Sequence, residues 1–244
     1  MKLSIIVPVY NEAQTIAEVV ERVLAVEVGS LEREVLVVND GSTDDTALHI
    51  DRSAWRGNPV VRVFDNPINL GKGAAVRLGL RHATGDIVLI QDADLELDPR
   101  QHMRLVQPIV DGRSQVVYGS RFAGRSNAIP RRTRVANQAL TALTNVLYGS
   151  RLTDMETAYK VFRREILDGI RLRCVGFDFE PEFTAKILRA GHRILELPID
   201  YNPRRVADGK KIRWIDGVDA VYALLKCRFA SAEAQPSRAP QARV

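Results

Sequence analysis

The chain has little cysteine and no long apolar run. Its 244 residues include two cysteines, Cys174 and Cys227, which stand far apart and have no Cys/His cluster beside them. This spacing argues against a disulfide framework and a zinc site, and it suits a reducing compartment such as the cytoplasm. No run approaches the roughly 20 apolar residues that span a bilayer. We therefore expect any membrane contact to be peripheral or to come through a membrane partner.

Signals of several other protein classes are also missing. The apolar stretch from Leu3 to Val9 is too short for a secretory core and is interrupted by Pro8. A net charge of +5 indicates an anionic partner. Aromatic and basic residues do not interleave along strands, however, so we expect no nucleic-acid binding. No Gly-rich, Arg-containing loop follows the first apolar run, which argues against a nucleotidyltransferase.

Short apolar runs alternate with stretches of helical periodicity through the first half of the chain. We predict strands at residues 3–9, 34–39, 60–64, 87–90 and 115–118, and helices from residue 16 and at about 44–52, 72–83, 99–112 and 135–148. Nearly continuous apolar strands separated by helices predict an α/β fold with a mainly parallel sheet flanked by helices. We expect one domain over residues 1–230 and a disordered tail over residues 231–244.

Polar clusters follow four of the predicted strands. They are Tyr10-Asn11-Glu12, Asp40-Gly41-Ser42, the stretch from Asn69 to Gly73, and Asp92-Ala93-Asp94. In open α/β sheets, ligands bind outside the carboxyl ends of the strands, where helix N-termini and loop backbone converge. Four clusters at one sheet edge predict a binding site there.

Asp92-Ala93-Asp94 is the most informative of these motifs. Two carboxylates around one small residue, directly after an apolar strand, offer hard oxygen ligands to Mg²⁺ or Mn²⁺ and leave positions for phosphate oxygens. The alternative is an ordinary polar turn. The position of the motif among the other clusters favours the metal.

The remaining clusters each allow two interpretations. Asp40 can accept hydrogen bonds from a nucleobase, while its neighbours Ser42 and Thr43 can cap a helix. Tyr10 and Glu12 fit stacking on a base and contact with a ribose, or a simple strand-to-helix turn. Gly71 and Gly73 around Lys72 favour close approach to a phosphate at a helix start, although glycines also serve turns.

Together these motifs resemble the family-2 inverting glycosyltransferases with the GT-A fold. The residues that carry the resemblance are Pro8 to Glu12, Val37 to Ser42 and Asp92 to Asp94, in this order and spacing. Further segments resemble the branch with dolichol-phosphate mannose synthase and the polyprenyl-phosphate glycosyltransferases: Gly119 to Phe122, Asp154 to Lys160, Tyr201 to Arg204 and Gly209 to Ile212. The resemblance covers roughly residues 2 to 229.

The resemblance implies roles for individual residues. Those implied for the nucleotide sugar are Pro8, Tyr10, Asn11, Glu12, Asp40, Gly71, Lys72 and Asp92. Those implied for the divalent metal are Asp92, Asp94 and Glu96, although some relatives carry Gln at the position of Glu96. Those implied for the acceptor phosphate are Arg121, Arg134 and Arg204. The catalytic set is Asp92, Asp94, Arg121 and Asp154. Asn39 stands where the commoner Asp-Asp-Gly-Ser form of the motif has its first Asp, so the role of a carboxylate at this motif falls mainly to Asp40.

The implied reaction transfers a hexose from a UDP- or GDP-sugar to a polyprenyl phosphate. An acceptor phosphate is already anionic and needs no strong general base, whereas a sugar hydroxyl needs a positioned carboxylate. Asp154 and Glu156 are therefore candidates for positioning the sugar or orienting these arginines, and the rival assignment makes Asp154 that base. Residues 1–120 would hold the donor and 121–230 the acceptor. The alternatives are transfer to a soluble acceptor and a non-catalytic nucleotide-sugar-binding module.

A last helical pattern runs from Trp214 to Phe229, with basic residues around it. It fits a helix packed on the sheet and equally an interfacial helix that meets anionic lipid. The second interpretation would make the protein peripheral on the cytoplasmic face of a membrane. Both stay open at the level of sequence.

Overall fold

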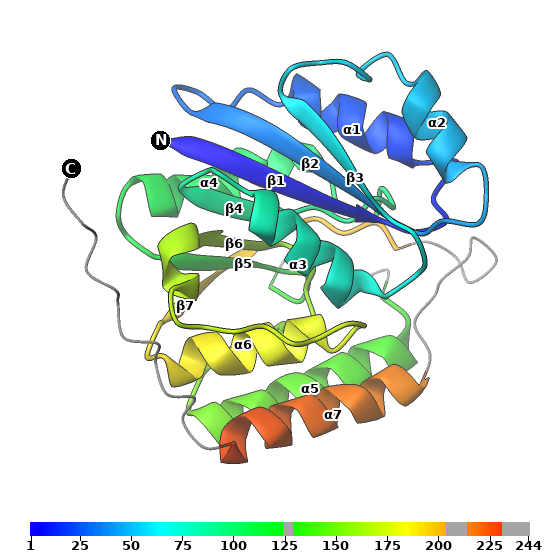
Figure 1. The fold of residues 1–244 in the computed structure, drawn as a ribbon. Coiled ribbons are helices and arrows are strands. Elements are labelled where there is room, and N and C mark those ends of the chain that lie inside the picture. The colour runs from blue at the N-terminus through cyan, green and yellow to red at the C-terminus, as the bar shows by residue number, and fades with distance from the viewer. Residues whose placement is uncertain (124–128, 204–213, 231–244) are drawn as a thin grey trace, which may run out of the picture.

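A mixed seven-stranded sheet forms the centre of the molecule (Figure 1). The computed structural model describes residues 1–123, 129–203 and 214–230, without the side chains of residues 214–216. The strands are β1 (Lys2–Val9), β2 (Glu32–Asp40), β3 (Val61–Asn66), β4 (Ile87–Ile90), β5 (Val116–Ser120), β6 (Lys160–Arg163) and β7 (Ile194–Pro198). Their order is β3-β2-β1-β4-β6-β5-β7. Only β6 among these strands runs antiparallel to its neighbours, so the predicted mainly parallel sheet is confirmed.

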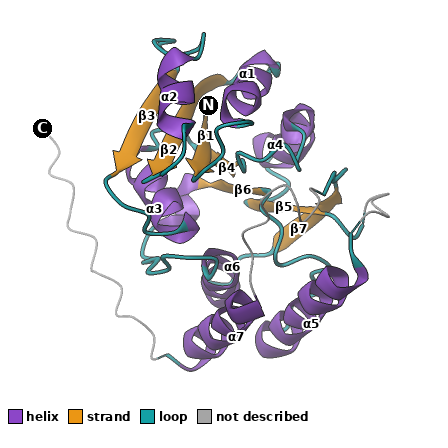
Figure 2. Ribbon diagram, turned by 90° about the vertical axis from the view of Figure 1, so that its right-hand side faces the viewer, coloured by secondary structure: helices purple, strands orange, loops and turns teal. Residues whose placement is uncertain are grey.

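Helices cover both faces of the sheet (Figure 2). They are α1 (Ile16–Ala25), α2 (Thr46–Arg52), α3 (Lys72–His82), α4 (His102–Val110), α5 (Arg131–Tyr148), α6 (Phe179–Arg189) and α7 (Trp214–Phe229), with short 3₁₀ turns η1 (Pro99–Gln101) and η2 (Arg164–Leu167). No helix among the described residues is long and apolar enough to cross a membrane.

The alternation of side chains along β1 explains why both faces are covered. Ile5 and Val7 lie in one core cluster with α1, α2 and α4, whereas Ile6 lies in a second cluster with α3 and α6. Successive side chains of a strand point to opposite faces, and here both faces are apolar. The continuous apolar run of β1 is thus the pattern that a strand buried on both sides requires.

Three elements of the second half were not predicted: β6, α6 and β7. Each places charged residues in or beside the core, among them the fully buried Lys160 in β6 and the buried Glu180 and Glu182 in α6. Glu196 interrupts the apolar pattern of β7. Charges at such positions hide the apolar periodicity from which a strand or helix is inferred.

The helices α5, α6 and α7 form an outer layer (Figures 1 and 2). Leu152, Met155, Ala185, Leu224 and Cys227 are buried in a separate apolar cluster here. Tyr148 donates a hydrogen bond from its hydroxyl to the Leu224 carbonyl at 2.6 Å, which fastens α5 to α7. The helix predicted over residues 214–229 therefore packs on the domain with one of its faces.

Close contact between α3 and β1 predicts a stability effect at Gly79. A Cβ on Gly79 would lie 2.5 Å from Cγ2 of Ile6. We expect Gly79→Ala to lower the free energy of unfolding by about 1–3 kcal/mol because it overpacks this contact. Gly217→Ala in α7 is the matched control, since a Cβ there meets no described atom within 4 Å. That control should raise stability by about 0.5 kcal/mol. Urea denaturation measures both, and equal shifts would contradict the packing argument.

Glu34 predicts a pH dependence of stability. Its buried carboxylate accepts hydrogen bonds from Ser4 Oγ and Thr84 N, both at 2.6 Å, and pairs with Lys2 Nζ at 3.0 Å. Burial alone would raise its pKa, but the hydrogen bonds from Ser4, Thr84 and Lys2 outweigh burial and lower the pKa from 4.5 to about 2. Because the pKa is lower in the folded state, the stabilisation is present above pH 4.5 and is lost as the pH falls towards 2.

We therefore expect Glu34→Gln to lower the free energy of unfolding by about 2 kcal/mol near neutral pH. The difference from the natural chain should shrink progressively through the acid range. Glu32→Gln, at an exposed position of the same strand, should leave stability and its pH dependence unchanged. Denaturant titrations at several pH values test this, and a difference that is independent of pH would refute the role of the carboxylate charge.

Candidate active site

The structure brings the first two polar clusters together at the carboxyl ends of β1 and β2. Asn11 has a φ of 49° and donates from its backbone N to Ser42 Oγ at 3.0 Å. Its side-chain Oδ1 accepts from Thr43 N at 2.8 Å. Glu12 N donates to Thr46 Oγ1 at 2.9 Å. The two loops that the sequence assigned to the nucleoside therefore form one surface, with the half-buried Tyr10 beside the buried Pro8 and Glu12.

The carboxylate of Asp40 accepts hydrogen bonds from other residues of its own chain. The residue is 2% exposed, and its carboxylate accepts from Gly71 N at 2.6 Å, Asn66 Nδ2 at 2.7 Å and Leu70 N at 3.2 Å. A carboxylate offers about four acceptor sites, and three of them are taken by Asn66 at the end of β3 and by the loop that precedes α3. Asp40 fixes this loop, and its contact with a nucleobase stays a prediction.

The glycines at the start of α3 have a structural reason that the sequence did not indicate. Gly71 has a φ of 101°, and a Cβ on it would lie 2.4 Å from the Val175 carbonyl oxygen. Gly73 N donates to Gly176 O and Ala74 N donates to Val175 O, both at 3.0 Å. The 175–176 backbone thus accepts from the Gly73 and Ala74 amides, while the predicted approach of a phosphate to Gly71 and Gly73 stays a prediction. The glycines allow that close approach of two backbones.

Lys72 is the most strongly held side chain of the site. Its ammonium lies 2.8 Å from Asp92 Oδ1 and 2.8 Å from Glu180 Oε1. Burial by itself would lower the pKa of Lys72, but Asp92 and Glu180 outweigh burial and raise the pKa above its ordinary value. Lys72 therefore stays charged and joins the β4 loop to α6. Sequence reasoning missed Glu180. The one feature that could have identified it is an acidic residue within the apolar start of α6.

The loop after β4 holds the remaining acidic candidates. Asp94 Oδ1 accepts from Glu96 N at 3.1 Å, and Tyr201 donates from its hydroxyl to Glu96 Oε2 at 2.6 Å. Thr15 Oγ1 donates to the Ala93 carbonyl at 2.7 Å, which ties this loop to the one after β1. The loop is thus held from both halves of the chain.

Among the described residues, no three His, Cys, Asp or Glu side chains form a group that could hold a metal alone. The expected set of Asp92, Asp94 and Glu96 is not gathered, because Asp92 pairs with Lys72 and Glu96 with Tyr201. Mg²⁺ is usually bound by one or two protein carboxylates together with substrate phosphates. The partly exposed Asp92 and Asp94 fit a metal of that kind, shared with a diphosphate.

Gln91 anchors this loop from within the core. Its Oε1 accepts from the Tyr159 hydroxyl at 2.8 Å and lies 2.7 Å from His102 Nε2, and its Nε2 donates to the Asp92 carbonyl at 2.9 Å. Burial lowers the pKa of His102 to about 3, so the imidazole is neutral. Sequence reasoning missed this hub because its members are distant in sequence, and although Tyr159 stands in the Asp154 to Lys160 motif, nothing local indicates its contact with Gln91.

Arg121 and Asp154 form a buried bidentate pair. Arg121 donates from Nε to Asp154 Oδ2 and from Nη2 to Oδ1, both at 2.8 Å, and from its backbone N to Oδ2 at 2.9 Å. Such a fork fixes the guanidinium plane. The guanidinium carbons of Arg121 and Arg134 lie 5.8 and 5.9 Å from the Phe122 ring centroid, so these two arginines are brought together. Arg204 and the segment 209–212 lie outside the described residues.

Two further ionisable residues follow Asp154 in the chain, the partly buried Glu156 and the fully buried Lys160. Burial, reinforced by the charge of Glu180, raises the pKa of Glu156 to about 7, and its Oε1 is a buried oxygen without a hydrogen-bond partner in the described chain. Burial lowers the pKa of Lys160 to about 8, while its ammonium donates to the Met155 carbonyl at 3.0 Å. Glu156 therefore keeps one buried carboxylate oxygen without a donor from the described residues.

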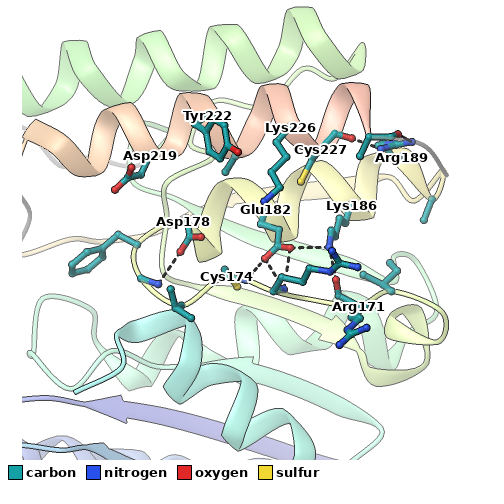
Figure 3. A pocket seen from close by; sticks show the side chains of 18 of the residues that line it. Arg171, Cys174, Asp178, Glu182, Lys186, Arg189, Asp219, Tyr222, Lys226 and Cys227 are labelled. Carbon is teal, nitrogen blue, oxygen red and sulfur yellow. Dashed lines mark hydrogen bonds and ion pairs between the residues drawn. The ribbon is translucent and has the colours of Figure 1, made fainter. Parts of the chain in front are cut away.

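A cavity of about 940 Å³ lies away from most of these motifs, between α6, α7 and the segment 166–178 (Figure 3). Charged side chains in its wall interact with neighbouring residues of the same wall. Glu182 accepts a hydrogen bond from Arg173 N at 3.0 Å and forms an ion pair with Lys186 at 2.7 Å. Asn69 and Val175 in its wall belong to the segments around the α3 start. The motif residues at the sheet edge, rather than this cavity, make up the candidate active site.

Known proteins of similar sequence are glycosyltransferases. Glycosyltransferase AglD of Haloferax volcanii is 30% identical over 214 residues, which are 84% of this chain and 34% of that protein. The undecaprenyl-phosphate 4-deoxy-4-formamido-L-arabinose transferase of Klebsiella pneumoniae is 31% identical over 230 residues, 93% of this chain and 67% of that enzyme. The chain thus spans about a third of the first relative and about two thirds of the second.

Solved structures show the same fold. Glucosyl-3-phosphoglycerate synthase from Mycobacterium tuberculosis, in complex with Mn²⁺, uridine diphosphate and phosphoglyceric acid, superposes with a TM-score of 0.73 at 21% identity, over 94% of this chain and 79% of that one. The predicted GT-A architecture is therefore confirmed.

The family model described as glycosyl transferase family 2 matches residues 4–171 of the chain. This span contains all the loops at the carboxyl ends of β1 to β4. With this match over more than half of its length, the chain belongs to glycosyl transferase family 2.

Proposed function

We propose that this glycosyltransferase inverts the anomeric centre as it transfers a hexose from a UDP- or GDP-sugar to a polyprenyl phosphate, with Mg²⁺ or Mn²⁺. One observation carries the proposal: Tyr201 joins the two substrate sites. Its hydroxyl donates to Glu96 in the β4 loop at 2.6 Å, and its ring centroid lies 5.4 Å from the Arg121 guanidinium. A cationic group suited to an acceptor phosphate is thus placed next to the loop suited to a donor diphosphate.

The donor site is assigned to residues 1–120. Pro8, Tyr10, Asn11, Glu12 and Asp40 line the joined loops after β1 and β2, which suits a nucleoside. Lys72 and the backbone at Gly71 lie between these loops and Asp92. The solved relatives hold uridine diphosphate with Mn²⁺ or Mg²⁺, which supports a nucleoside-diphosphate donor and a divalent metal here.

Asp92 and Asp94 would hold the metal, with oxygens of the donor diphosphate completing its coordination. Bound there, the metal would neutralise the charge that develops on the departing diphosphate. Lys72 supplies a second positive charge at the same point, because it is kept protonated beside Asp92. Glu180 positions this ammonium from α6, so the donor charge is met by side chains that the core already orients.

The acceptor site is assigned to residues 121–230, with Arg121, Arg134 and Arg204 on the acceptor phosphate. Two anionic substrates repel each other, and guanidinium groups that grip phosphate bidentately counter this repulsion. Both oxygens of Asp154 are engaged by Arg121, so Asp154 orients the arginine rather than acting as a base. The phosphate oxygen attacks the anomeric carbon without prior deprotonation, and the bond to the diphosphate breaks on the opposite side.

The relative named undecaprenyl-phosphate transferase supports a lipid-linked acceptor. The protein would then work at the cytoplasmic face of a membrane. The solved relatives, which bind phosphoglyceric acid, support the second candidate, a soluble phosphorylated acceptor. Both acceptors carry the phosphate or carboxylate that the arginines require. A non-catalytic binding module is disfavoured because Asp92, Asp94 and Lys72 are all in place.

Transfer assays with labelled donors test the proposal. Purified protein should transfer label from one UDP- or GDP-sugar to a short polyprenyl phosphate in the presence of Mg²⁺ or Mn²⁺, with inversion at the anomeric carbon. Asp94→Asn should lower this turnover by at least about a hundred-fold, because one metal carboxylate is lost. Asp98→Asn, in the same loop but paired with Arg100, is the control and should remain active. If label appeared in phosphoglycerate and not in the polyprenyl phosphate, the soluble acceptor would take the place of the lipid acceptor in the proposal.

Arg121→Lys tests the acceptor assignment. Lysine keeps the charge but cannot form the two-pronged contact with Asp154 or with a phosphate. We expect the KM for the acceptor phosphate to rise at least about ten-fold, while the KM for the donor stays within about two-fold. Arg113→Lys is the matched control, since Arg113 is exposed and pairs only locally with Asp111. A rise in donor KM with unchanged acceptor KM would reverse the assignment.

A further inference from the structure

Helix α7 has apolar residues on two opposite faces. Ala220, Ala223, Leu224 and Cys227 are buried against the domain. Val218, Tyr222, Leu225 and Phe229 recur at i, i+4, i+7 and i+11, which places them in one stripe along the other side of the helix. All four are exposed, with Tyr222 at 63% and Phe229 at 77%. A helix that needs only one apolar face for packing thus carries a second.

The neighbouring helix α5 repeats this pattern. Val135, Ala139, Ala142 and Val146 have the same spacing and are exposed, with Val135 at 65% and Val146 at 82%. The leucines of α5 lie on another side and pack into the cluster shared with α6 and α7. The two helices lie side by side at the outer edge of the molecule (Figures 1 and 2). Exposed apolar stripes on two adjacent helices suit an interaction site.

The charges around the stripes are mainly positive. Successive residues of an α-helix are about 100° apart around its axis, so Lys226 and Arg228 lie roughly 80° to either side of the α7 stripe. The Lys226 ammonium lies 5.5 Å from the Tyr222 ring centroid, along the stripe's edge. In sequence α5 contains three arginines and no acidic residue, and α7 contains Asp216 and Asp219 beside its two basic residues. Long basic side chains beside aromatic and aliphatic ones suit a surface that is apolar within and anionic at its rim.

We propose that the exposed faces of α5 and α7 dock on an anionic lipid surface. The apolar stripes enter the headgroup region, and Lys226, Arg228 and the exposed Arg131 and Arg132 meet lipid phosphates. This deepens the proposed function and rests on it in one respect. Arg134, assigned to the acceptor phosphate, directly precedes Val135 of the α5 stripe, so docking here brings the acceptor site to the depth of a lipid phosphate.

Vesicle co-sedimentation tests this surface without any catalysis. The full chain is mixed with phosphatidylcholine vesicles that contain or lack phosphatidylglycerol, and that contain no polyprenyl phosphate. We expect binding to rise at least about five-fold with the anionic lipid. The double variant Tyr222→Ser, Phe229→Ser should bind about ten-fold more weakly. The control Leu48→Ser removes an exposed leucine from α2, far from α5 and α7 in Figure 1, and should bind as the natural chain does.

A second variant separates charge from apolar insertion. Lys226→Gln with Arg228→Gln should lose most of the dependence on phosphatidylglycerol. The proposal is overturned if the natural chain ignores vesicles, or if the Tyr222/Phe229 variant binds them unchanged. It is also overturned if the chain forms a dimer in solution that this variant dissociates, because a second copy would then cover the stripes. Transfer to detergent-solubilised acceptor is measured separately, so a failed docking test leaves the proposed reaction standing.

Discussion

The ammonium of Lys72 between Asp92 and Glu180 is the interaction on which the site depends. It connects three elements that are distant in sequence: the start of α3, the loop after β4 and the buried face of α6. A charge removed from water is stable only where opposite charges replace its hydration. Loss of Asp92 or Glu180 would leave Lys72 with a single carboxylate partner, so each of the three charges helps to hold the other two in place. The same contact that stabilises the fold holds the Lys72 ammonium beside Asp92 at the sheet edge.

Other hydrogen bonds in the site hold the backbone beside Lys72 and Asp92 in place. The Asp40 carboxylate holds the backbone of Gly71, the residue before Lys72, and the 175–176 backbone accepts from the first amides of α3. Gln91 fixes the Asp92 carbonyl from the core side. Lys72 and Asp92 are therefore placed by hydrogen bonds to backbone on both sides, which leaves their side chains little freedom. Preorganisation of this kind lowers the cost of stabilising charge during a reaction.

The sequence was informative where local pattern and burial agree. The apolar run at residues 87–90 gave the bounds of β4 without error, and the clusters after β1, β2 and β4 do lie at one edge of the sheet. The elements that it missed contain Lys160, Glu180 and Glu196, whose burial depends on partners that no local pattern reveals. The donors to Asp40 lie 26 to 31 residues away. For α7 the predicted helix is confirmed and one of its faces packs against α5 and α6, while the interfacial interpretation stays a proposal that its exposed second face supports.

The capped start of α3 has a consequence for how substrate preference can change. An anion held by backbone amides at a helix N-terminus is recognised whatever the side chains are. Here the amides of Gly73 and Ala74 already donate to Gly176 and Val175, so these two amides do not serve an anion and side chains such as Lys72 gain importance. Side chains can be exchanged one at a time while the backbone stays in place. A scaffold of this design can diversify its choice of donor and acceptor through single substitutions, without a new fold.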